Sequence, residues 1–215
     1  MRDFVRKMAN SGPMLSKAGL YDMVTRKAEQ LGFNVFAKNY KIDAQQLAMK
    51  VCRNPEIRII NFEEIKICGI LYRGRFSTTI GLNARRSATG KNFDCMHELI
   101  HYWFHDRQTF YCIDSISDHI EWQANEGAAQ FLMPYQSFIP NYCHLHDRFY
   151  TGMAPQAAHN ALIMALARSY AVGETAVKFR INSLRQEIAQ YIGGAAMDDI
   201  KIVSQRHEFS SENCR

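Results

Sequence analysis

The first regular pattern in the chain is amphipathic and helical. Apolar residues recur at helical spacing over residues 20–31, and Gly32 follows at a position where glycine commonly ends a helix. A second helix is predicted over residues 43–52. Asp43 is its expected N-cap, because an aspartate side chain accepts hydrogen bonds from first-turn amides. Two helices are therefore expected before the pattern changes.

The next part of the chain has the composition of β-strands. Residues 57–62, 65–72 and 76–83 are rich in β-branched and aromatic side chains, alternate in part, and are separated by short polar links. Short links favour pairing between successive strands, so we predict a small antiparallel sheet. Residues 84–91 have loop composition and lead into the next helix.

Helical periodicity returns after the predicted sheet. Two helices are predicted over residues 92–106 and 119–132. Pro134 and Pro140 are expected to bracket a loop, because proline interrupts a helix. A small sheet followed by separate helices predicts an α+β fold.

The last third of the chain predicts a helical pair. Residues 156–171 and 174–192 have helical spacing, and a polar tail follows. The chain is expected to divide into a main domain, a helical subdomain resembling a helix-turn-helix and a tail. The expected ranges are 1–145, 146–195 and 196–215.

Composition narrows the class of protein. The hydrophobic content of 47% and charged content of 22% are ordinary for a globular chain. No signal-peptide core and no apolar stretch of membrane-spanning length is present in the sequence. The six cysteines are far apart and form no C-x-x-C pair, which favours reduced thiols over a disulfide scaffold. We expect a cytoplasmic protein that does not associate with membranes.

The net charge of +5 conceals a strong asymmetry. Residues 1–91 carry 17 Lys and Arg against 7 Asp and Glu, whereas residues 92–147 carry one arginine against 8 acids. An acidic, histidine-containing block is a favourable environment for a divalent cation. The basic segment could attract an acidic partner, although a solvated basic surface explains it more simply.

The acidic block contains the string His97-Glu98-Leu99-Ile100-His101. Residues four apart lie on the same face of a helix, so the two histidines can reach one metal ion. Glu98 projects beside that face, where a general base for activated water should lie. The pattern predicts a catalytic zinc site, and the donor set leaves manganese open.

A catalytic zinc needs a third protein ligand, and the following predicted helix offers carboxylates. Glu121 is favoured, because Asn125 lies one turn further on and could orient a ligating histidine. Glu126 is the alternative. His105 lies eight residues from His97, about 12 Å along the helix axis, too far to share the ion with it.

Three spaced motifs resemble those of the ImmA/IrrE family of metallopeptidases. The family pattern F-x-x-x-H-E-L-G-H, then E-x-E-A-N-x-F-A, then L-L-M-P, is matched most closely within residues 93–134, and the similarity extends over about 20–190. Three positions depart from the pattern: Ile100 replaces Gly, Gln123 replaces the second Glu, and Gly127 replaces Phe.

The resemblance implies a zincin-like fold, in which a motif helix lies beneath a small sheet and the next helix supplies a glutamate. It implies that His97, His101 and Glu121 hold the metal and that Glu98 is the base. Known members cleave helix-turn-helix repressors, so a repressor is the expected protein substrate. The expected function is a zinc-dependent endopeptidase. The alternative is a metal-containing regulator that binds DNA or senses a partner without cleaving it.

Two functional questions stay open at this stage. The side chain that stabilises the oxyanion is not identified by the sequence. The candidates are Tyr102, Tyr111, His119, His144 and His146. Residues 167–177 resemble a helix-turn-helix segment, and Lys178, Arg180 and Arg185 follow on its second helix. These cations are too few to favour direct nucleic-acid binding, and a helical hairpin packed on the main domain is preferred.

Overall fold

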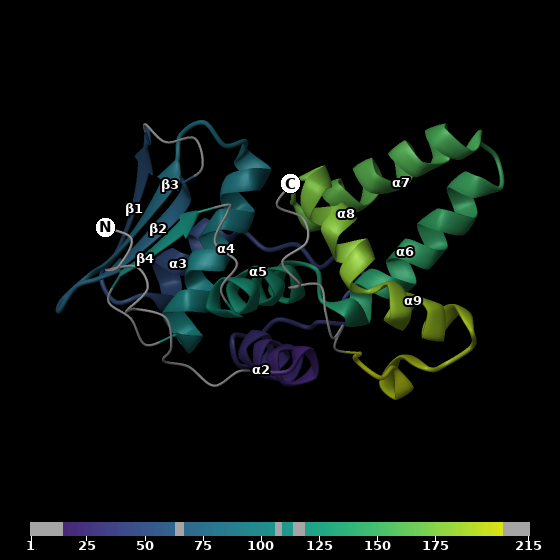
Figure 1. The fold of residues 1–215 in the computed structure, drawn as a ribbon, viewed down its shortest axis with the longest axis horizontal. Helices are drawn as coiled ribbons and strands as arrows, with labels where there is room; N and C mark the ends of the chain where they lie inside the picture. Colours follow the sequence, from purple (N-terminus) through teal and green to yellow (C-terminus); the bar gives the residue numbers. More distant parts are fainter. Residues whose placement is uncertain (1–14, 63–66, 106–108, 114–118, 204–215) are drawn as a thin grey trace, which may run out of the picture.

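A four-stranded sheet lies against a layer of helices, and a helical hairpin extends from the far side of that layer (Figure 1). The structure is a computed structural model that describes residues 15–62, 67–105, 109–113 and 119–203. In chain order its elements are α2 (Lys17–Gln30), α3 (Ala44–Val51), β1 (Pro55–Ile60), β2 (Ile67–Arg73), β3 (Thr78–Asn83), α4 (Ala88–Phe104), β4 (Thr109–Ile113), α5 (His119–Leu132), α6 (Tyr135–Tyr150), α7 (Pro155–Tyr170), α8 (Glu174–Ser183), α9 (Arg185–Ile192) and a short 3₁₀ turn (Met197–Asp199).

The sheet is mixed, with the strand order β1-β3-β2-β4. Strand β1 pairs with β3 in parallel, and β2 pairs antiparallel with both β3 and β4. The prediction of a wholly antiparallel sheet is therefore wrong for β1. Strand β3 lies between β1 and β2 because it is the most buried of the three, with Ile80 and Leu82 at 1% and 0% exposure. The fourth strand, β4, was not predicted.

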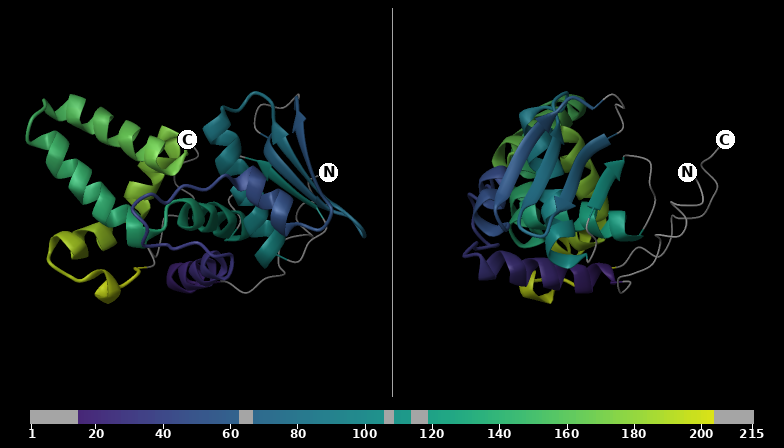
Figure 2. Two further views of the ribbon diagram at one scale, coloured as in Figure 1. Left: turned by 180° about the vertical axis from the view of Figure 1, so that it is seen from behind. Right: turned by 90° about the vertical axis from the view of Figure 1, so that its left-hand side faces the viewer.

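Helix α4 lies at the centre of the fold. Ser87 caps it by accepting a hydrogen bond from the Gly90 amide at 3.0 Å, so the helix begins four residues before its predicted start. One side packs on β2 and β3, and α5 packs on the other side with α2 beyond it. Figure 2 shows that the described helices lie on one side of the sheet. The arrangement confirms the expected α+β, zincin-like fold.

Helix α6 occupies a region that was predicted to contain a loop. Pro134 precedes its first turn, and Pro140 lies inside it. A proline within a helix removes one backbone hydrogen bond and typically costs about 3 kcal/mol. Burial of the preceding Phe138 and Ile139, both 0% exposed, offsets this cost. Pro134 separates α5 from α6, but the residues between the two prolines are helical, so the loop prediction is wrong.

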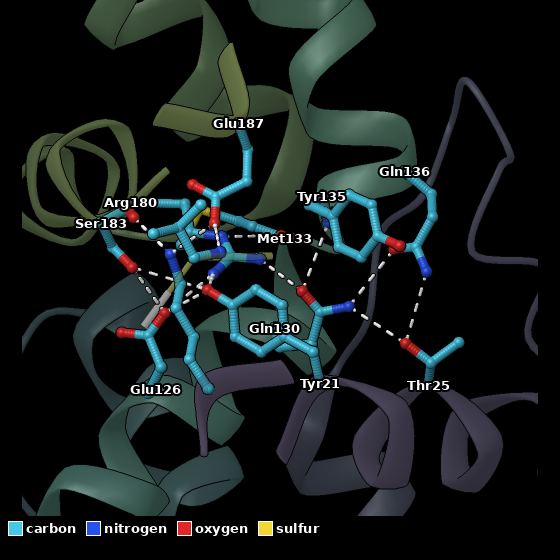
Figure 3. Close-up of polar contacts among 12 residues, drawn as sticks. Tyr21, Thr25, Glu126, Gln130, Met133, Tyr135, Gln136, Arg180, Ser183 and Glu187 are labelled. Atoms are coloured by element: carbon cyan, nitrogen blue, oxygen red, sulfur yellow. Dashed lines mark hydrogen bonds and ion pairs between the residues drawn. The ribbon is translucent and has the colours of Figure 1, made fainter. Parts of the chain in front are cut away.

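The C-terminal helices are tied to the main body by a buried cation. The helix predicted over residues 174–192 is divided at Leu184 into α8 and α9. Arg180 of α8 is only 1% exposed and donates to the Met133 carbonyl at 3.0 Å. Its guanidinium also contacts Tyr21, Glu126 and Gln130 (Figure 3).

This contact set changes the interpretation of the second helix. Arg180 had been a candidate for contact with DNA, but its charge is directed into the protein.

The expected division at residue 145 falls inside α6. Whether residues 146–195 form a separate subdomain stays a prediction, and most of the expected tail, residues 204–215, lies outside the described residues. None of the helices in the described part of the chain has the length and apolar character needed to cross a bilayer.

Candidate metal centre

Three side chains from α4 and α5 converge on one point. The Nε2 atoms of His97 and His101 are 3.0 Å apart. The Glu121 carboxylate approaches both, at 3.2 Å from His97 Nε2 and 3.4 Å from His101 Nε2. The ligand atoms of these three residues all lie within 4.8 Å of one another. The structure thus brings together the two histidines and the glutamate that the sequence had grouped.

The second nitrogen of His97 has its own partner. His97 Nδ1 lies 2.9 Å from Oδ1 of Asn125, which is one helical turn beyond Glu121. An amide oxygen can only accept a hydrogen bond, so His97 Nδ1 carries a proton, and in a neutral His97 the lone pair is then on Nε2. The histidines are buried, whereas Glu121 is 12% exposed and Asn125 is exposed. The solvent side of the centre is therefore the side formed by α5.

The Glu98 side chain lies between α4 and strand β2 of the sheet. It is 0% exposed, and neither of its carboxylate oxygens has a hydrogen-bond partner among the described residues. A Cβ atom built on Gly69 of β2 would lie 2.7 Å from Glu98 Oε1, which is closer than two such atoms can approach. Gly69 is therefore required for the carboxylate to lie where it does. The β2–β4 register shifts beside this glycine, between Ile67 and Gly69.

The pKa values of these ionisable groups are shifted in different directions by burial and by neighbouring groups. Burial raises the pKa of Glu98 to about 8, because an ionised carboxylate loses its hydration there. Burial would also raise the pKa of Glu121, but hydrogen bonds with His101 and His97 outweigh it and lower that pKa to about 2. Burial lowers the pKa of His101 to about 3. The centre therefore offers an ionised carboxylate and a neutral imidazole at neutral pH, beside a carboxyl group that readily holds a proton.

The donor set fits a divalent metal ion. Two imidazole nitrogens and one carboxylate oxygen form the three-ligand set that catalytic zinc sites use, with one coordination position left open. The orphaned carboxylate of Glu98 is buried next to that set, where a nearby cation would stabilise its ionised form. The residues present are therefore compatible with a bound zinc ion.

Glu126, the alternative third ligand, is engaged elsewhere. Its Oε1 accepts hydrogen bonds from Tyr21 and Ser183 and forms an ion pair with Arg180 at 3.2 Å (Figure 3). Its carboxylate lies in the network that joins α2, α5 and α8. The geometry therefore favours Glu121 over Glu126 at the metal.

This difference predicts opposite outcomes for two matched substitutions. Glu121→Gln should abolish stoichiometric zinc binding, because the neutral amide is a poor ligand. Glu126→Gln should keep the metal and reduce the free energy of unfolding by about 1–3 kcal/mol, the usual value of a hydrogen bond to a charged group. Elemental analysis and urea denaturation measure the two effects. Loss of zinc in Glu126→Gln together with full zinc in Glu121→Gln would transfer the ligand role.

Two departures from the family pattern compensate each other in space. A Cβ atom at Gly127 would lie 3.1 Å from Cγ2 of Ile100, so the isoleucine side chain fills the space above the glycine. Ile100 is on α4, Gly127 is on α5, and both are buried. The isoleucine side chain thus occupies the space that a larger residue at position 127 would need, and α4 and α5 stay in contact.

The described oxyanion candidates are spread over α4, α5 and α6. The Tyr102 hydroxyl accepts a hydrogen bond from the Arg53 amide, at the end of α3. His144 is exposed on α6, and His146, which is half-buried on the same helix, stacks its ring on Tyr150. His119 begins α5, two residues before Glu121. Tyr111 lies in β4, whose side chains are outside the described residues.

Sequence reasoning missed three residues that contact the centre. His105 had been excluded as a ligand, yet its Nδ1 lies 2.8 Å from His101 Nδ1. Gln123 had been noted only as a departure, and its Oε1 lies 3.1 Å from His105 Nε2. The four-residue spacing after His101 could have indicated His105. The role of Gly69 could not be read from the sequence, because it depends on how β2 packs over α4.

The fold and the convergent His-His-Glu group define a zincin-like domain of the metallopeptidase type. Residues 44–182 match the family model of the Peptidase M78 family, the IrrE N-terminal-like domain, and the chain belongs to this family. This confirms the resemblance to ImmA/IrrE metallopeptidases. A search of curated proteins and a search of solved structures each found no significant match.

Proposed function

We propose that this protein is a zinc-dependent endopeptidase that hydrolyses a peptide bond in a regulatory protein, and that this substrate is a helix-turn-helix repressor. The observation that supports it best is the position of Glu98. A carboxylate that is fully buried, without a hydrogen-bond partner, beside a three-ligand set is expensive to maintain for structure alone. Its presence is explained if it takes part in proton transfer.

Each residue of the centre has a separate role in the proposed hydrolysis. His97, His101 and Glu121 would hold the metal, and Asn125 keeps His97 in its ligating tautomer. A zinc ion held there supplies Lewis acidity, which polarises a carbonyl group and lowers the pKa of a bound water. Manganese could fill the same role with the same donors.

Glu98 is the proposed proton carrier. It accepts a proton from the attacking water and then delivers it to the nitrogen of the departing amine. Burial alone raises the Glu98 pKa to about 8, and a cation held by the neighbouring ligands would lower it again, so that the ionised carboxylate could act as the base. Gly69 leaves room for this carboxylate, because a side chain at that position would displace it.

The substrate class is proposed from the family resemblance. The test is to incubate the zinc-loaded protein with helix-turn-helix repressors encoded beside its gene. We expect discrete fragments to appear, to be lost after chelation, and to return when zinc is restored. Mass spectrometry of the fragments would give the cleaved bond. If the repressors are bound tightly and stay intact under all three conditions, the non-catalytic regulator is the better description and the peptidase proposal fails.

A further inference from the structure

A chain of hydrogen bonds leads away from the proposed metal ligand His101. Its Nε2 faces the ligand cluster, whereas its Nδ1 lies 2.8 Å from Nδ1 of His105. The other ring nitrogen of His105, Nε2, lies 3.1 Å from Oε1 of Gln123. His101, His105 and Gln123 are 0%, 5% and 3% exposed. We call these three residues the His101 relay.

We propose that His105 and Gln123 are positioning residues that fix the tautomer in which His101 can bind the metal. The proposal rests on the metal centre described above, and it does not depend on the identity of the substrate. It assigns a role to a histidine that is too distant from His97 to be a ligand of the same ion. It also explains why a hydrogen-bond acceptor is present at position 123.

The direction of the relay follows from which atoms can donate. The Gln123 oxygen can only accept, so His105 must carry its proton on Nε2. A neutral His105 then has a bare Nδ1, which can only accept. His101 must therefore carry its proton on Nδ1, and its Nε2 presents a lone pair to the ligand cluster.

The opposite direction would disable the ligand. If His105 donated from Nδ1, His101 Nδ1 would have to accept. A neutral His101 would then carry its proton on Nε2, pointing at His97 Nε2 and Glu121. A protonated nitrogen cannot bind a metal ion. The acceptor at position 123 is what selects the productive direction.

The backbone around His105 is fixed as well. His105 is the residue that ends α4, and its amide donates to the His101 carbonyl at 3.1 Å. The Arg73 guanidinium of β2 donates to the carbonyls of His101 and His105 at 2.6 and 2.7 Å. The bond to the His105 carbonyl satisfies an acceptor at the end of the helix, where carbonyls lack intrahelical partners. The second imidazole is therefore held at a helix end that cannot easily unwind.

The two ligand histidines are thus oriented in parallel ways. Asn125 accepts directly from His97, and Gln123 accepts from His101 through His105. Both final acceptors are neutral amides on α5. They orient the imidazoles without adding another charge near Glu98 and Glu121.

The relay is tested first by zinc affinity, measured by competition with a chelator. Gln123→Met keeps a similar volume but has no strong acceptor, and we expect zinc affinity to fall by about 10–100-fold, as is typical for partners of metal ligands. Gln123→Glu restores an acceptor and should bind zinc at least as tightly as the wild type. The matched control is Gln136→Met, a buried glutamine of α6 that contacts Gln130 and Thr25. It should leave zinc affinity unchanged.

The second measurement locates the protons directly. In the zinc-loaded wild-type protein with ¹⁵N-labelled histidine, NMR should place protons on His101 Nδ1 and His105 Nε2 and none on His105 Nδ1. A merely structural role for His105 would not require this pattern. This spectrum needs no variant, so it decides the question even if Gln123→Met fails to fold.

Three results would overturn the proposal. They are a proton on His105 Nδ1, wild-type zinc affinity in folded Gln123→Met, and an equal loss of affinity in Gln136→Met. None of these readouts uses peptide hydrolysis. A protein that binds zinc through the predicted tautomers but cleaves no repressor would therefore refute the peptidase function and leave the relay intact.

Discussion

Glu98→Gln is expected to lower the rate of peptide hydrolysis by about 10²–10⁴-fold while leaving the metal and the fold in place. The amide has nearly the same size as the carboxyl group but cannot accept the proton of water. Glu98 makes no described hydrogen bond that the substitution would break, and it is not among the three grouped ligand residues. The loss should therefore appear in turnover alone.

Two measurements isolate this effect. Elemental analysis should find wild-type zinc in Glu98→Gln, and urea denaturation should find no loss of stability, because a buried ionisable group without partners has been removed. Glu121→Gln is the comparison, since it should lose both zinc and activity. Cleavage by Glu98→Gln at the wild-type rate would show that another group accepts the proton, and the assignment of Glu98 would be wrong.

Exchanging the residues at positions 100 and 127 is expected to produce the largest change in stability. Ile100→Gly removes a fully buried side chain and places glycine inside α4, which together should cost about 3–5 kcal/mol. Gly127→Phe forces a ring into space that Ile100 occupies and should cost about 1–3 kcal/mol or more. The double variant should be more stable than the sum of these losses predicts, because the new ring can fill the space that the isoleucine vacates.

The interaction is measured as a double-mutant cycle in urea. We expect a favourable coupling energy of about 1–3 kcal/mol between the two positions. The control pairs Gly127→Phe with Ile163→Gly, which empties a buried position on α7. That pair should be additive within about 0.5 kcal/mol. Additivity of the Ile100 and Gly127 changes would mean that the two positions are not coupled energetically, contrary to this prediction.

The parts of the structure that the sequence predicted are those governed by local spacing. The four-residue interval between His97 and His101 places both imidazoles on one face of a helix in any fold. The same four-residue spacing predicted that Glu121 and Asn125 lie on one face of the following helix. The Asp43 cap was also correct, since its side chain accepts from the Gln46 amide at 3.0 Å.

The parts that were missed depend on partners distant in the sequence. Alternating residues in β1 and β3 indicate strands, but they do not say which strands become neighbours or in which direction. Pro140 is tolerated in α6 because the same turn buries Phe138 and Ile139, and this burial is a property of the folded protein. The roles of His105 and Gly69 likewise required the positions of Gln123 and Glu98.

The contacts of Glu126 restrain helix α5 next to the candidate metal centre. It directly follows Asn125, and its bonds with Tyr21, Ser183 and Arg180 fasten this turn of α5 to α2 and α8. The buried ion pair between Lys17 and Glu187, at 3.0 Å, joins α2 and α9 in turn. These contacts tie the middle of the helix that carries Glu121, the proposed third ligand, to the interior, so we expect this part of α5 to unfold together with it. A metal ion that arrives at this centre meets donors already in position, so little of its binding energy is spent on ordering the chain.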